Sequence, residues 1–222
     1  MTNEVDFVEK PRLEWHNKRP FAIARLPTQY AHALAQIALD REEFIKSLPV
    51  SEDWQESAVR EVVSSRYQNY NALVLSLRCV PLFVAIRSTY RYLLGNMEVV
   101  EKFATLQCWV NIHRKGQHLT RHLHGKVPLI GAFIARGEGS TTSYGPSPVA
   151  DERDHAFENR DGRLLITWGG PHYHEVSTWE DSEHPRVSYG FNINFLPEED
   201  TNNIDKVMYP HLIPFDGPGF ST

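Results

Sequence analysis

The sequence lacks the features that mark membrane and secreted proteins. Its longest apolar stretch, residues 73–86, is broken by a serine, an arginine and a proline, and it is shorter than the ~20 apolar residues of a membrane span. Residues 1–12 contain acidic side chains and no apolar segment of the kind found in signal peptides. The only cysteines are Cys79 and Cys108, with no Cys-x-x-Cys spacing, which favours free structural thiols in a reducing compartment. We therefore expect a cytoplasmic protein with no membrane segment.

The chain also lacks an excess of positive charge. It has 23 basic and 28 acidic side chains and a formal net charge of -5, and the two signs are interspersed, so no basic stripe is available for a nucleic-acid backbone. We expect no nucleic-acid partner. No internal repeat or low-complexity segment is present, and no direct signal decides the oligomeric state, so a homodimer is left open. With 222 residues, 41% of them hydrophobic, the chain can bury the core of one domain.

The single domain, residues 1–222, divides by pattern into three parts. Residues 1–100 are predicted to be mainly helical, with one helix starting at Thr28 and another over residues 82–94. Residues 101–200 show a period of two and frequent glycine and proline turns, which predicts a jelly-roll core; this part also contains the candidate metal ligands described below, so we expect it to be the metal-binding core. Residues 201–222 form a C-terminal tail. The fold class expected is α+β, a double-stranded β-helix (jelly roll) with the N-terminal helices packed outside.

Within the core, several segments are predicted as strands and one as a loop. The predicted strands are residues 105–113, 129–135, 163–168, 174–179 and 187–195. Residues 144–148 contain a glycine and two prolines and are predicted to form a loop. In the last strand, apolar residues from Val187 to Phe195 alternate with polar ones, so one face is suited to a core and the other to a polar interior.

Three histidines are candidate metal ligands. His122 and His124 occupy alternate positions, and alternate side chains of a strand project from the same face, so both can reach one ion. His174, from a later strand, would complete one face of the site and leave open positions for other ligands, which is typical of catalytic metals. The competing interpretation is that these are ordinary polar residues on strands, because the chain contains 11 histidines.

An anion site is predicted beside this metal site. Arg186 and Ser188 share the polar face of the last strand, and a guanidinium can bind both oxygens of a carboxylate at once. Asn192 lies on the same face, and Asn111 lies on the polar face of the strand at residues 105–113. We expect both amides to contact the bound anion or its neighbours.

The second half of the chain resembles a known family. The motifs are residues 108–116 (CWVNIHRKG), 122–124 (HLH), 162–166 (GRLLI), 174–176 (HEV), 186–188 (RVS) and 191–194 (FNIN). Over residues 70–197 their order resembles that of the iron(II) and 2-oxoglutarate dependent oxygenases, most closely an HxH-containing group. The resemblance implies that His122, His124 and His174 bind Fe(II), and that Arg186, helped by Ser188, binds the distal carboxylate of the cosubstrate 2-oxoglutarate.

The motif differs from the wider superfamily at one position, because most relatives there have an acidic residue where this chain has His124. Three imidazoles make a more positive site than two imidazoles and a carboxylate, with consequences for metal preference. Two interpretations stay open: His124 is a ligand, or it contacts the substrate or the groups that hold the ligands. Glu175 is a weaker candidate, since it points to the opposite side of the strand from His174.

The resemblance implies a dioxygenase that uses dioxygen and 2-oxoglutarate to hydroxylate a C–H bond, releasing succinate and CO2. The substrate, a small molecule or a peptide, is not indicated by any motif; Trp109 and Tyr144 are candidate contacts to it. Two rival functions are a three-histidine cupin-like metalloenzyme without a keto-acid cosubstrate, which would not need Arg186 and Ser188, and a noncatalytic jelly-roll binding module.

Overall fold

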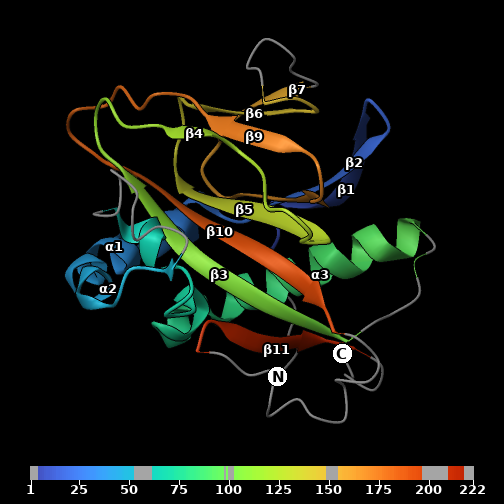
Figure 1. The fold of residues 1–222 in the computed structure, drawn as a ribbon, viewed down its shortest axis with the longest axis horizontal. Helices are drawn as coiled ribbons and strands as arrows, with labels where there is room; N and C mark the ends of the chain where they lie inside the picture. The colour runs from blue at the N-terminus through green and yellow to red at the C-terminus, as the bar shows by residue number, and fades with distance from the viewer. Residues whose placement is uncertain are drawn as a thin grey trace.

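The computed structural model describes residues 5–52, 62–97, 99, 103–148, 155–196 and 210–217. Its strands form two antiparallel sheets. The larger sheet contains, from one edge to the other, β1 (Glu9–His16), β2 (Arg19–Arg25), β8 (Arg163–Trp168), β5 (Leu129–Arg136), β10 (Arg186–Phe195), β3 (Ala104–His113) and β11 (Leu212–Asp216). The smaller sheet contains β4 (Leu119–His122), β9 (Tyr173–Val176), β6 (Thr141–Gly145) and β7 (His155–Glu158). The smaller sheet lies over one face of the larger (Figure 1), which is consistent with the predicted jelly roll.

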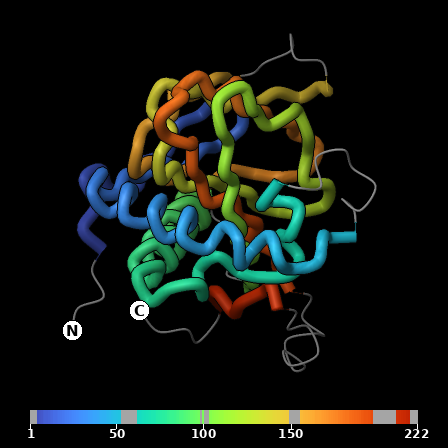
Figure 2. Tube along the Cα trace, turned by 90° about the vertical axis from the view of Figure 1, so that its left-hand side faces the viewer, coloured from blue at the N-terminus to red at the C-terminus, as the bar shows by residue number. Residues whose placement is uncertain are grey.

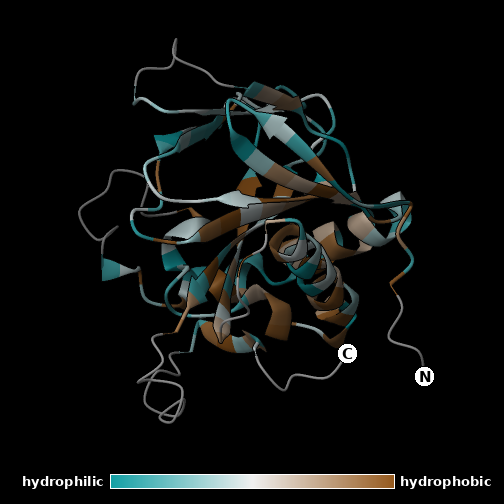
Figure 3. Cartoon of the chain, turned by 90° about the vertical axis from the view of Figure 1, so that its right-hand side faces the viewer, coloured by the Kyte–Doolittle hydropathy of each residue, from teal (hydrophilic) through white to brown (hydrophobic). Residues whose placement is uncertain are grey.

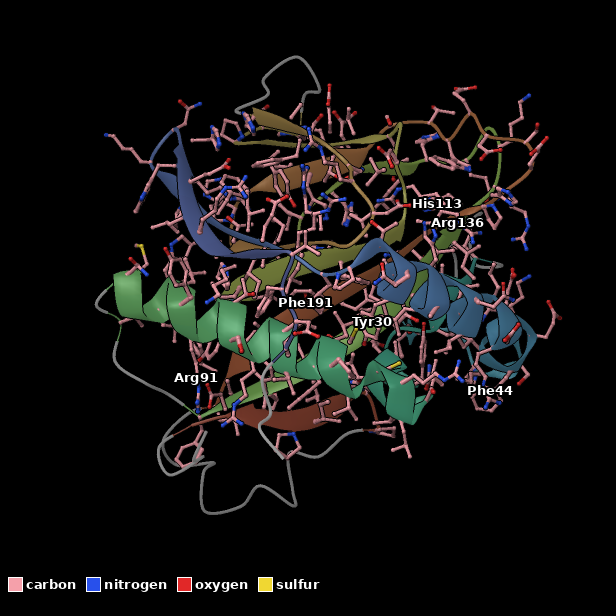
Figure 4. The ribbon with its side chains drawn as sticks, turned by 180° about the vertical axis from the view of Figure 1, so that it is seen from behind. Tyr30, Phe44, Arg91, His113, Arg136 and Phe191 are labelled. Carbon is pink, nitrogen blue, oxygen red and sulfur yellow. The ribbon has the colours of Figure 1, made fainter. Side chains whose placement is uncertain are left out.

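The helices cover the other face of the larger sheet (Figures 2 and 4). They are α1 (Thr28–Asp40), α2 (Glu42–Ser47) and α3 (Val80–Asn96), with the short 3-10 turns η2 (Val63–Arg66), η3 (Ala72–Val74) and η4 (Leu77–Cys79). Hydrophobic residues are concentrated in these helices and the larger sheet (Figure 3). In the described part of the chain, no helix is long and apolar enough to cross a membrane.

The alternating pattern of β10 places two kinds of side chain on the two faces of the larger sheet. Its odd positions, from Val187 to Ile193, are fully buried in the core with residues of α1 and α3. Phe191 lies between the helices and the sheet (Figure 4). Its even positions face the smaller sheet, opposite the polar positions of β3: Ser188 pairs with Asn111 and Asn192 with Gln107. The predicted assignment of the two faces of this strand agrees with the structure.

A hairpin near the N-terminus extends the larger sheet. Strands β1 and β2 are joined by Asn17 and Lys18, which have φ angles of 48° and 65°, as a type I′ turn requires. β2 then pairs with β8 and is buried almost throughout. The prediction of a mainly helical region before residue 100 omits this hairpin, although the two longer helices, α1 and α3, fall where they are expected.

Two further segments differ from the sequence prediction. Tyr144 lies within β6 and not in a loop, because residues 141–145 pair with both β7 and β9. The region expected to be a tail contains β11, which pairs with β3. The polar sequence of residues 51–68 predicts either a further helix or a long surface connection, and residues 53–61 of it lie outside the described residues.

Candidate functional site

Three histidines meet between the two sheets. His122 is the last residue of β4 and pairs directly with His174 of β9, so the two rings stand side by side, with their centroids 4.2 Å apart. His124 follows β4 and is not part of it, so the expectation that both residues share one strand is only half met. Nevertheless its ring lies 5.2 Å from that of His122 and 5.0 Å from that of His174. One nitrogen from each ring lies within 4.8 Å of the others.

Hydrogen bonds orient two of these rings. Nδ1 of His122 donates to the carbonyl oxygen of Thr120 at 2.8 Å, and Nδ1 of His124 donates to Oδ1 of Asn192 at 2.8 Å. In both rings Nε2 keeps its lone pair, as metal ligation requires. Nε2 of His124 and Nδ1 of His174 are buried and have no hydrogen-bond partner among the described residues.

All three imidazoles are held neutral. Burial is the main cause: it lowers the pKa of His122, that of His124 to about 4, and that of His174 well below its ordinary value. The neighbouring imidazoles lower the pKa of His124 and His174 further. Neutral rings offer lone pairs, so these residues have the donor set of a nitrogen-rich transition-metal site.

Arg186 supplies a buried positive charge to the same space. Its side chain is 2% exposed, Nε donates to Oγ of Ser140 at 3.2 Å, and Nη1 donates to Oγ of Ser188 at 3.1 Å. Burial lowers its pKa to about 10, so it stays charged at neutral pH. Among the described residues no carboxylate forms an ion pair with it. A buried cation of this kind is suited to an anionic ligand.

A cavity of about 590 Å³ connects the histidines and the arginine. Every site residue predicted from the sequence lines it: Trp109, Asn111, His122, His124, Tyr144, His174, Arg186, Ser188 and Asn192. The cavity also contacts residues that the sequence does not single out, among them Tyr67, Gln107, Thr142 and His211. Its size is within the range of small-molecule sites.

Two aromatic side chains flank the histidines. The ring of Trp109 stacks on His124, with centroids 5.8 Å apart, and the close approach of β10 at Gly190 leaves no room for a Cβ atom beside the indole. The ring of Tyr144 stacks on His174 at 5.7 Å. Burial raises the pKa of Tyr144 to about 12, although the charges of Arg19 and Arg186 oppose the shift. Its hydroxyl is therefore protonated at neutral pH.

Other candidate residues lie away from the three nitrogens. Glu175 forms an ion pair with Arg121, at 3.6 Å between Oε1 and Nη1, on the side of β9 opposite His174, as expected. His113 is buried at the end of β3 beside Arg186; burial and the charges of Arg186 and His118 lower its pKa to about 3. Ser140, which holds Arg186, follows Gly139 in a turn and carries no motif that would identify it from sequence.

No protein-family model matches the chain, and no curated protein sequence matches it. Among solved structures, the chain is similar to a prolyl-4-hydroxylase of Pseudomonas putida, with a TM-score of 0.55 and 16% identity, over 78% of this chain and 92% of that one. A 2OG-Fe(II) oxygenase family protein of Burkholderia pseudomallei also matches, with a TM-score of 0.44 and 12% identity, over 84% and 74% of the two chains. At its identity, the first similarity shows a shared fold.

Proposed function

We propose that this protein is a non-haem Fe(II) and 2-oxoglutarate dependent dioxygenase that hydroxylates a C–H bond of a small-molecule or peptide substrate. The observation that supports this most is one cavity that holds three neutral imidazoles and a buried guanidinium with no carboxylate partner among the described residues. The fold shared with a prolyl-4-hydroxylase also supports it. Within this proposal, the two sheets form a double-stranded β-helix.

The histidines fit a divalent metal. Their ligand atoms lie within 4.8 Å of one another, and the unpartnered Nε2 of His124 would otherwise be a buried acceptor without a donor. In the proposed site His122, His124 and His174 would hold Fe(II). Because all three residues are neutral, they would leave the positive charge of a bound metal uncompensated, which favours an anionic cosubstrate.

Arg186 fits the distal carboxylate of 2-oxoglutarate. It is charged, buried and braced by Ser140 and Ser188, and Asn111 lies next to Ser188, with Nδ2 3.5 Å from the hydroxyl. Asn192 is committed to His124, so we assign it to the metal ligand and not to the keto acid. Because these donors are already held in place before the ligand binds, the site favours tight binding of a short dicarboxylate.

Bound iron and 2-oxoglutarate would supply the oxidation of the substrate by dioxygen, with formation of succinate and CO2. The chain contributes positioning and exclusion of water. Trp109 and Tyr144 wall the cavity on either side of the histidines, where they would hold the substrate carbon close to the metal. Both rings are polar at one atom only, which permits contact with an apolar C–H group.

A second function is favoured by one observation: three imidazoles without a carboxylate are also the ligand set of cupin-like metalloenzymes that use no keto acid. Such an enzyme would give no role to the charge of Arg186. We therefore rank it second, and a noncatalytic jelly-roll binding module third, because the latter explains neither the neutral imidazoles nor a buried guanidinium that pairs with no carboxylate of the described residues.

An anaerobic titration with Fe(II) and then 2-oxoglutarate tests the proposal. The expected result is a saturable visible charge-transfer band, which requires both the metal and a chelated keto acid. His174→Ala should abolish the band and His118→Ala, an exposed histidine, should leave it unchanged. Tight metal binding without a band would favour the keto-acid-independent enzyme, and no metal binding would favour the binding module.

A further inference from the structure

A chain of three hydrogen bonds runs behind the ring of His124. His124 Nδ1 donates to Oδ1 of Asn192 at 2.8 Å, and Asn192 Nδ2 donates to Oε1 of Gln107 at 3.1 Å. Gln107 Nε2 then donates to the backbone carbonyl of Tyr67 at 3.3 Å. Asn192 and Gln107 are direct partners across β10 and β3, and both are buried.

The far end of this chain determines the direction of every bond in it. The carbonyl of Tyr67 can only accept a hydrogen bond, so Gln107 must turn its amide nitrogen toward it. Gln107 then presents its oxygen to Asn192, and Asn192 presents its own oxygen to His124. An oxygen acceptor requires the hydrogen of the neutral imidazole to be on Nδ1, which leaves the lone pair on Nε2.

Nε2 of His124 is the ring nitrogen that remains available to bind a metal. It is buried and has no hydrogen-bond partner among the described residues, and His124 is one of the three histidines whose ligand nitrogens lie within 4.8 Å of one another. Trp109 stacks on the ring with an interplanar angle of 25° and holds its plane. The hydrogen bond from Nδ1 to Asn192 then fixes both the tautomer of His124 and which of its nitrogens is left for a ligand.

We propose that Gln107 and Asn192 are positioning residues that hold His124 as a metal ligand through Nε2. A carboxylate at this position could ligate through either oxygen, whereas an imidazole ligates only through a nitrogen that is kept free of hydrogen. The two amides meet this requirement of the histidine. The identity of the metal rests on the proposed function, but the tautomer does not.

The tautomer can be measured in the metal-free protein. In protein with 15N-labelled histidine, long-range N–H correlation spectra at mildly alkaline pH distinguish protonated from unprotonated ring nitrogens. The expected result is a single His124 tautomer with hydrogen on Nδ1. His122 is an internal reference, because its Nδ1 bonds to the backbone carbonyl of Thr120 and not to a side-chain amide that can turn, so its tautomer should be the same in every variant.

Three variants separate a role in positioning from a role in packing. Asn192→Leu removes the acceptor, so both His124 tautomers should appear. Gln107→Met leaves Asn192 in place but frees its amide to turn its nitrogen toward His124, so the tautomer should also become mixed. Asn192→Asp keeps an oxygen acceptor and should restore the Nδ1 hydrogen. Asn194→Leu, a change at the next even position of β10, is the matched control.

Metal affinity gives a second readout. Titration with Co(II), followed by its visible absorption, should show a loss of about 10–100-fold in affinity for Asn192→Leu and Gln107→Met, with Asn194→Leu close to wild type. A His124 tautomer with hydrogen on Nε2, or one unaffected by both Asn192→Leu and Gln107→Met, would overturn the inference. These outcomes are independent of the keto-acid band: a fixed tautomer without a band would contradict only the proposed function.

Discussion

Both faces of the larger sheet are covered by other elements, but the buried charged side chains on the two sides have different kinds of partner. On the helix side, buried acids are paired: Asp216 accepts hydrogen bonds from Arg87 and Arg91 of α3, and Glu42 accepts two from Arg114. On the cavity side, Arg186 is buried with hydroxyl partners, and no described acid pairs with it. The helix face is organised for stability, whereas the cavity face keeps charge and lone pairs available for ligands.

Removal of a core side chain from the helix face should have the largest effect. Phe191 is completely buried between α1, α3 and the sheet, so Phe191→Ala is expected to reduce the free energy of unfolding by about 3–5 kcal/mol. Urea unfolding at equilibrium measures this value. Phe44→Ala is the control, because Phe44 is 52% exposed and its loss should cost about 0.5 kcal/mol or less. Equal losses at both positions would contradict the assignment of the core.

Replacement of the cavity cation should separate function from stability. Arg186→Met removes a desolvated charge and keeps a long apolar side chain, so the free energy of unfolding should stay the same or rise. Affinity for 2-oxoglutarate should fall by about 2–5 kcal/mol, because the distal carboxylate loses its charged donor. Calorimetric titration with the metal bound measures the affinity, and thermal unfolding measures the stability. A strongly destabilised variant would mean that Arg186 serves the fold and not a ligand.

The paired charges of the helix face predict a different response, one that depends on pH. Burial tends to raise the pKa of Asp216, but the hydrogen bonds and charges of Arg91 and Arg87 outweigh it and hold the pKa below its ordinary value of 3.8. The contribution of this pair to stability is therefore complete above that value and is lost as the pH falls through the pKa of the folded state.

Asp216→Asn should consequently destabilise the protein at neutral pH, by about 1–3 kcal/mol, and by less in acid. Measurement of the free energy of unfolding from neutral pH to about pH 3 tests both points. Arg91, in the C-terminal half of α3 (Figure 4), provides the comparison: Arg91→Met should reproduce part of the loss with the same pH dependence. A difference between wild type and Asp216→Asn that does not shrink in acid would contradict the ion-pair explanation.

The part of the site that could be predicted from sequence is the part carried by regular strands. β10 alternates strictly, so Arg186, Ser188 and Asn192 could be placed on one face before the structure was known. His122 and His174 could be grouped because β4 and β9 bring them side by side, whereas His124 lies just beyond the end of β4. A resemblance to a family supplied the order of the motifs.

The features that the sequence does not predict depend on contacts between residues distant in the chain, which leave no pattern in the local sequence. β1 is rich in charged residues and half exposed, so it has no apolar alternation, and it forms a strand because β2 offers it a partner. Ser140 and Gln107 acquire roles only through residues distant in the chain, Arg186 and Asn192. The glycine and prolines after Tyr144 suggested a loop, but pairing with β7 and β9 on both sides extends β6 to Gly145.

The smallest predicted effect concerns the edge of the larger sheet, at the turn between β1 and β2, away from both of its faces. Lys18 has a φ angle of 65° in the turn between β1 and β2, a conformation that glycine adopts without the steric penalty of a Cβ atom. Lys18→Gly should therefore raise the free energy of unfolding by about 0.5–1 kcal/mol, with no change in metal or 2-oxoglutarate binding. Lys10→Gly, within β1, should instead lower it by a similar amount. If Lys18→Gly destabilises the protein as much as Lys10→Gly does, the backbone at position 18 does not favour glycine and the positive φ of the turn is contradicted. If only Lys10→Gly destabilises it, position 18 carries the strain expected of a type I′ turn that joins β1 to β2.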